Sequence, residues 1–135
     1  MDCTPKEKHR LVKLAIQLAT SLENFRTPRS NEPVDHNHVS FILTYVRTKP
    51  SAKNLLDFLD LAPNSEYAKR SRSFPPQLKE AARRTKEHIR LIDRDFTQCS
   101  ADARMEFLSF VLAEAKRILY YKKSLRNEKK RYHRR

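Results

Sequence analysis

The chain has 135 residues, no glycine and a formal net charge of +13 at pH 7. The length fits one domain, and the lack of glycine excludes the glycine-dependent P-loop, GxGxxG turn, GxSxG elbow and type I′ hairpin turn. We therefore expect an all-α fold, a single compact bundle of about five helices over residues 1–125, followed by a basic C-terminal tail over residues 126–135.

Three helices are predicted in the first half of the chain. The first runs from about Pro5 to about Leu22, because leucine and alanine recur there at helical spacing. The second begins after the cap residue Asp35, and the third begins after Ser51 and ends before Pro63. Each loop between them contains proline, which favours chain reversal.

Two longer helices are predicted in the second half. One runs from about Pro76 to Phe96, and the other begins after the cap residue Ser100 and continues to about Leu125. The segment 64–76 between the two halves is ambiguous, because it combines a short capped turn with a basic run and two prolines. His88 lies near the apolar side of its helix and is expected at the edge of the core.

The positive charge is concentrated in the second half. Residues 1–68 hold 9 basic and 8 acidic side chains, whereas residues 69–135 hold 20 basic and 8 acidic ones. Five of these cations fall within an arc of roughly 80° on one helix, at a spacing of about 100° per residue. A phosphate backbone can follow such a stripe, and the clustering into one arc favours that interpretation; the alternative is a solvated face held by salt bridges to Glu80, Glu87 and Asp93. The stripe consists of Lys79, Arg83, Lys86, Arg90 and Arg94.

The C-terminal tail is a second candidate for contact with nucleic acid. From Lys122 to the end there are eight basic residues and one acidic residue. Such runs are often interaction tails, although solubilising the chain or acting as a localisation signal are alternatives. Tyr120 and Tyr121 either stack on bases or rim the core or an interface. The candidate cations here are Lys122, Lys123, Arg126, Lys129, Lys130 and Arg131.

The sequence lacks the patterns of an enzyme, a metal site or a membrane protein. His36 and His38 would diverge by about 200° on a helix, so they do not share a metal there. Cys3 and Cys99 do not form a disulfide framework or a zinc motif, and we expect a reducing, cytoplasmic setting. No recognisable nucleophile, base and oxyanion set appears, and the apolar run from residue 107 to 115 is too short to span a membrane. We therefore expect no catalytic residues, no cofactor and no membrane partner.

The chain resembles the small subunits of multisubunit CRISPR effector complexes, which act in antiviral defence. This class covers the small subunits of type III complexes and the helical C-terminal part of type I large subunits, which some systems also translate separately. The resemblance is one of size, charge and helical architecture, together with an aromatic pattern in the last long helix. That pattern reads Phe107-Leu108-Ser109-Phe110, then Glu114-Ala115, then Tyr120-Tyr121-Lys122.

The resemblance implies a non-catalytic, sequence-independent nucleic-acid-binding subunit. Such a subunit supports pairing of the guide RNA with its target RNA or DNA, or holds the displaced strand, while pairing itself reads the sequence. Its partners would be the large subunit, the backbone subunits and further copies of itself, with Phe107, Phe110 and Tyr121 as the docking surface. The alternative from another class is a helical adaptor whose basic face binds an acidic protein.

Overall fold

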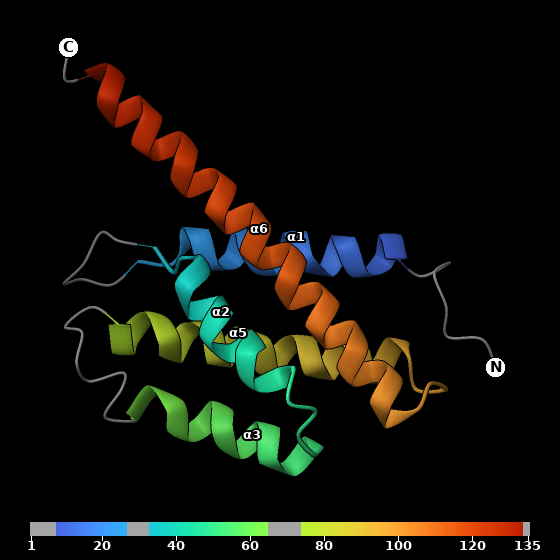
Figure 1. Cartoon of the computed structure of the whole chain (residues 1–135). Helices are drawn as coiled ribbons and strands as arrows, with labels where there is room; N and C mark the ends of the chain where they lie inside the picture. The colour runs from blue at the N-terminus through green and yellow to red at the C-terminus, as the bar shows by residue number, and fades with distance from the viewer. Residues whose placement is uncertain (1–7, 27–32, 65–73, 134–135) are drawn as a thin grey trace.

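The computed structural model describes residues 8–26, 33–64 and 74–133, with the backbone alone for residues 74–75 and 130–133. Within these ranges the chain forms five α-helices, one short 3₁₀ helix and no strand. This confirms the predicted all-α bundle. The elements are α1 (Lys8–Asn24), α2 (His36–Val46), α3 (Ala52–Leu61), the 3₁₀ helix η2 (Ala62–Asn64), α5 (Phe74–Asp95) and α6 (Ala101–His133) (Figure 1).

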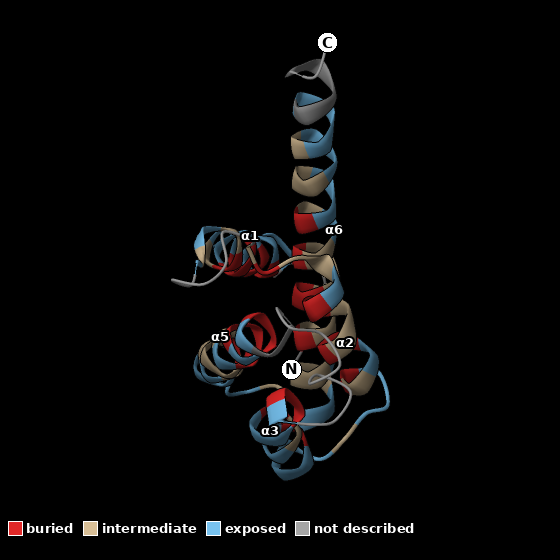
Figure 2. Ribbon diagram, turned by 90° about the vertical axis from the view of Figure 1, so that its left-hand side faces the viewer, coloured by how far each residue is buried: buried red, intermediate tan, exposed pale blue. Residues whose placement is uncertain are grey.

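The helices pack in two layers around one core. α6 crosses α1 and α2 and makes its main contacts with them, while α5 packs beneath α1 and α2 and carries α3 on its other side. Seen from the side, α6 and α2 form one layer, and α1, α5 and α3 form the other (Figure 2). The buried apolar side chains face the space between these layers, as the helical spacing of leucine and alanine predicts.

The helix starts follow from local capping chemistry. The Ser51 hydroxyl accepts the N–H of Asn54 at 3.1 Å, and the Ser100 hydroxyl accepts the N–H of Ala103 at 3.1 Å. Each contact satisfies one of the N–H groups that the first turn of a helix leaves without a partner. The predicted caps of α3 and α6 are therefore confirmed.

The turn after α2 holds a non-glycine residue in a left-handed conformation. Lys49 has a φ of 57°, in a chain that contains no glycine. This backbone conformation costs a residue with a Cβ about 1–2 kcal/mol, and Pro50 follows directly, which disfavours the right-handed helical region for the residue before it. Lys49 therefore lies, in this strained conformation, in the turn that connects α2 to α3.

Asp35 caps α2 and carries a strongly perturbed carboxyl group. Its Oδ1 accepts the N–H of Asn37 at 2.8 Å, and its own backbone N–H donates to Nδ1 of His38 at 3.1 Å. Burial raises the pKa of Asp35, but the hydrogen bond and charge of His38, the Asn37 N–H and Lys123 together outweigh burial. The pKa of Asp35 therefore lies well below its ordinary value.

The depressed pKa predicts a specific acid sensitivity. The stabilisation from Asp35 is complete above the unfolded-state pKa of about 3.9 and is lost as the pH falls towards the folded-state pKa. In Asp35→Asn the cap oxygen remains but the charge is gone, so its free energy of unfolding should fall less steeply than that of the wild type between about pH 5 and pH 2. Urea denaturation followed by circular dichroism measures this, with Asp57→Asn on the exposed side of α3 as the control. Identical pH slopes for wild type and Asp35→Asn would contradict the prediction.

α6 continues beyond its predicted end. The sequence places that end at about Leu125, whereas the helix continues to His133. Lysine and arginine are good helix formers, and no proline or glycine interrupts residues 101–133. A run of positive charge therefore does not end this helix, and its C-terminal part projects beyond the other helices (Figure 1).

Candidate nucleic-acid interface

The predicted stripe on α5 lies on the exposed side of that helix, but acids occupy much of it. Arg83 makes a two-pronged contact with Glu80, at 2.6 and 2.9 Å, and its Nη1 lies 3.0 Å from Glu87. The hydrogen bond to Glu80 raises the pKa of Arg83. This arrangement matches the alternative interpretation of the stripe as a solvated face held by Glu80 and Glu87.

The other members of the α5 stripe divide into paired and unpaired cations. Lys86 pairs with Asp60 of α3, and Arg94 pairs with its neighbour Asp95 at 3.0 Å. Lys79 and Arg90 are exposed and form no ion pair with any residue in the described ranges. Only these two residues of the stripe therefore offer a positive charge without an acid beside it.

The projecting part of α6 carries the second predicted set. Its cations begin where the helix leaves the bundle, because Leu119 is the last buried residue of α6 among those whose side chains are described. Lys122 lies 2.6 Å from Glu23 of α1, and Arg126 lies 3.6 Å from the same carboxylate. Lys123 lies 3.4 Å from Asp35 at the start of α2.

The base of this projecting helix is therefore a junction of three helices, with three cations facing two acids. Lys129 lies further out, is exposed, and forms no ion pair with a described residue. The side chains of Lys130 and Arg131 lie outside the described residues, although their backbone continues the helix. We call residues 120–133 of α6 the α6 arm.

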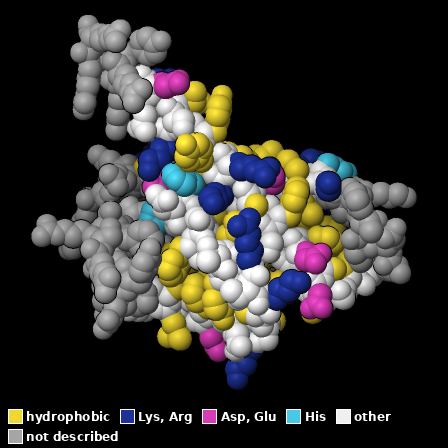
Figure 3. Space-filling view, viewed as in Figure 1, with side chains coloured by type: hydrophobic (Ala, Val, Ile, Leu, Met, Phe, Trp, Pro, Cys, Tyr) yellow, Lys and Arg dark blue, Asp and Glu magenta, His cyan; other side chains and the backbone are white. Residues whose placement is uncertain are grey.

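The two predicted sets do not form one track. The exposed side of α5 is turned away from α6, and the arm extends beyond the opposite layer (Figure 2). On the face that carries α2 and α6, Lys and Arg side chains alternate with hydrophobic ones (Figure 3). One ligand that lies along the arm does not also lie along the α5 stripe.

The three residues predicted to dock a partner are in different surroundings. Phe107 packs against Phe96 with ring centroids 4.9 Å apart, and Phe110 is partly buried against the core. Tyr121, by contrast, is 63% exposed, with Leu125 exposed one turn further along. Only Tyr121 of the three therefore lies on an open surface.

Sequence reasoning missed the contacts at the base of the arm. The ring of His36 meets Tyr120 edge to face, with centroids 5.0 Å apart. Burial lowers the pKa of His36, and the positive charges of Lys123 and Lys116 add to this effect against the opposing effect of Asp35. Glu23, His36 and Lys116 are far apart in sequence, so no local pattern predicts that they meet here.

Other predictions concern buried and sulfur-containing residues. His88 is 5% exposed and its Nε2 lies 3.1 Å from the carbonyl oxygen of Leu14, so it links α5 to α1 near the core, as expected.

Cys99 is disulfide-bonded, which corrects the expectation of reduced cysteines. The spacing of two cysteines cannot show whether the fold brings them together. A disulfide does not fit the expected reducing setting, and the chain's other cysteine, Cys3, lies outside the described residues.

Neither a metal cluster nor a membrane span is found in the described part of the chain. No three His, Cys, Asp or Glu side chains gather there in a group that could hold a metal ion. None of the helices described combines the length and apolarity needed to cross a bilayer.

Comparisons with family models, with curated proteins and with solved structures found no match to this chain. The resemblance to the small subunits of CRISPR effector complexes therefore stays a prediction.

Proposed function

We propose that the chain is a non-catalytic protein that binds the phosphate backbone of nucleic acid, independently of base sequence, through the α6 arm. The observation that carries this proposal is the placement of charge on one side of the arm. Lys122, Arg126 and Lys129 follow each other at spacings of four and three residues, which places them on the same side of a helix. Lys122 and Arg126 both reach Glu23 from that side.

The ion pairs at the base of the arm are compatible with binding a phosphate chain. The side chains of Lys122, Lys123 and Arg126 are 37–40% exposed, and pairs of this kind contribute at most about 1 kcal/mol. Because these cations remain open to solvent, a phosphate can approach each of them while the carboxylate stays beside it. Lys129 forms no ion pair with a described residue.

The proposal predicts salt-dependent, sequence-independent binding. Four phosphate contacts to a single strand should give a slope of log K against log salt of about −3. Fluorescence anisotropy with a labelled oligo-U strand and a strand of mixed sequence measures both the slope and the sequence dependence. We expect the two affinities to agree within about threefold, since backbone contacts carry no sequence information. No saturable binding at low salt, or a slope near zero, would rule the proposal out.

The exposed apolar side chains on the arm support a second candidate function. Tyr120 and Tyr121 are 59% and 63% exposed beside the cations, and such side chains often mark protein interfaces. An adaptor for an acidic protein would use both the charges and these rings. Co-purification before and after nuclease treatment separates the two functions, because a protein complex survives the nuclease and a nucleic-acid-mediated one does not.

The more specific role, a small subunit of a CRISPR effector complex, rests on the resemblance alone. If it holds, the arm would contact guide or target strands, and further copies or larger subunits would dock nearby. Reconstitution with the subunits of a CRISPR effector complex tests this role, because the chain should then enter the complex in a fixed ratio.

A further inference from the structure

A cavity of about 460 Å³ lies between α3 and the first turns of α6, at the end of α6 opposite the arm. It exists because α3 packs on α2, α5 and η2 but, within the described ranges, does not reach α6. α5 contacts both α3 and α6, but side chains do not fill the space between those two helices. Cavities of this size hold small organic molecules in other proteins.

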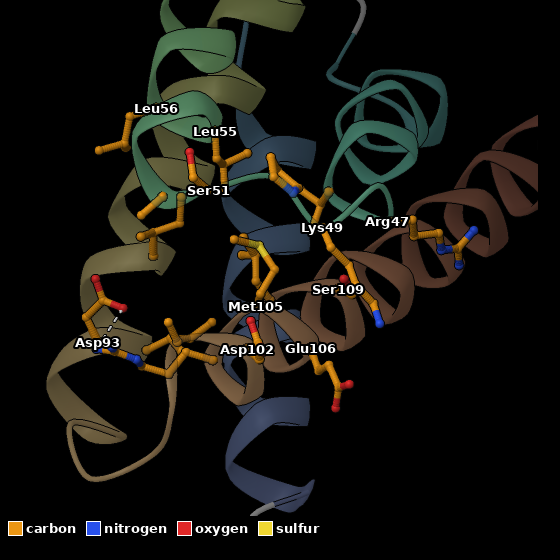
Figure 4. Close-up of a pocket in the computed structure, with 18 residues that line it drawn as sticks. Arg47, Lys49, Ser51, Leu55, Leu56, Asp93, Asp102, Met105, Glu106 and Ser109 are labelled. Carbon is orange, nitrogen blue, oxygen red and sulfur yellow. Dashed lines mark ion pairs between the residues drawn. The ribbon is translucent and has the colours of Figure 1, made fainter.

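The inside of the cavity is apolar. Leu55 of α3 and Met105 of α6 point into the space between their helices (Figure 4). Ile89 and Ile92 of α5 and Leu108 of α6 also line it. A ligand with an aliphatic body would remove this surface from water without burying an unpaired polar group.

Charged side chains surround the mouth, and part of their charge is already compensated. Arg104 pairs with Asp93 at 3.5 Å. Asp102 lies in the first turn of α6, where the helix dipole favours a negative charge. The Nε of Arg104 is nevertheless buried without a hydrogen-bond partner among the described residues, so this side chain can still donate to an anion.

Two cations at the mouth lack this compensation. Arg47 and Lys49 are exposed, and neither forms an ion pair with a residue that the structure describes. Lys49 extends from the turn after α2 to the neighbourhood of Ser109 on α6, whereas Arg47 points away from the space between α3 and α6 (Figure 4). The left-handed backbone at Lys49 sets the direction in which its Cα–Cβ bond leaves the turn. Glu106 is the one further carboxylate among the lining residues.

We propose that this cavity binds a medium-chain aliphatic carboxylate. The alkyl chain of the ligand occupies the apolar space beneath α3, and its carboxylate meets Lys49 at the mouth. The proposal does not depend on nucleic-acid binding, because the cavity and the α6 arm lie at opposite ends of α6.

Isothermal titration of the full chain with decanoate tests this proposal. Decyltrimethylammonium has an aliphatic chain of similar length and a positively charged head group. It should bind at least about tenfold more weakly than decanoate. Butyrate carries the same head group on a short chain, and should bind at least about a hundredfold more weakly, since each buried methylene contributes about 0.8 kcal/mol. These two probes separate recognition of the head group from burial of the chain.

Matched variants locate the site. Lys49→Gln should weaken decanoate binding by about five- to tenfold, whereas Glu106→Gln, a neutralisation among the lining residues, should leave it unchanged or strengthen it. Ser109→Phe places a ring in the cavity and should abolish binding, with circular dichroism confirming that each variant is folded. Equal binding of the two decyl probes, unchanged binding by Ser109→Phe, or no saturable decanoate binding by the folded wild type would overturn the proposal.

Discussion

Neutralising three cations of the α6 arm is expected to weaken nucleic-acid binding by about ten- to a hundredfold. The arm variant combines Lys122→Gln, Arg126→Gln and Lys129→Gln, and each lost contact should cost roughly 0.5 to 1 kcal/mol. The slope of log K against log salt should become shallower by about 2, because three fewer counterions are released from a single strand. Fluorescence anisotropy at several salt concentrations measures both effects.

The stripe on α5 provides the matched control. Lys79→Gln, Arg90→Gln and Arg94→Gln together remove the same charge from the exposed side of α5. This α5 variant should lose affinity only through the lower net charge, so its salt slope should stay close to that of the wild type. A larger loss in the α5 variant would move the interface to α5, and equal losses in both would indicate binding by net charge alone.

The elements were predictable from the sequence because their signals are local. The caps at Asp35, Ser51 and Ser100 act within three residues of the chain, and so the starts of α2, α3 and α6 follow from the sequence. The end of α6 was not predicted, because a change from apolar to basic residues alters the surface of a helix without ending it. Phe107 was assigned to an interface because its partner Phe96 lies in the turn after α5, and their contact depends on how that turn folds back onto α6.

The sequence predicted which basic residues belong to the candidate site, but not which residues surround them. Its cations are evident from the sequence, but their acid partners are distant: Glu23 meets Lys122, and Asp35 meets Lys123. Whether two basic helices form one track or two depends on the layer to which each belongs, and side-chain periodicity does not determine that. The cavity beneath α3 could not be predicted for the same reason: it exists because α3 and α6 do not contact each other, which depends on how the helices pack.

The arm can project only because the preceding part of α6 is held firmly. Leu112 is fully buried where α6 crosses α1 and α2. Leu112→Ala is therefore expected to lower the free energy of unfolding by about 2–5 kcal/mol, through lost burial and a residual cavity. Domains of this size have about 5–15 kcal/mol in total, so the loss is a large fraction of the stability. Urea denaturation followed by circular dichroism measures the change.

Ile16→Ala is the matched control for this variant, because Ile16 lies on α1 and is 48% exposed. It should cost less than about 1 kcal/mol, since an exposed side chain leaves no cavity. If Leu112→Ala also costs less than about 1 kcal/mol, α6 is not an integral part of the core. The arm would then have no rigid support, and the proposal that it presents cations in a fixed array would lose its structural basis. A loss in the expected range, with the arm variant as stable as the wild type, would show that folding and binding use different parts of the same helix.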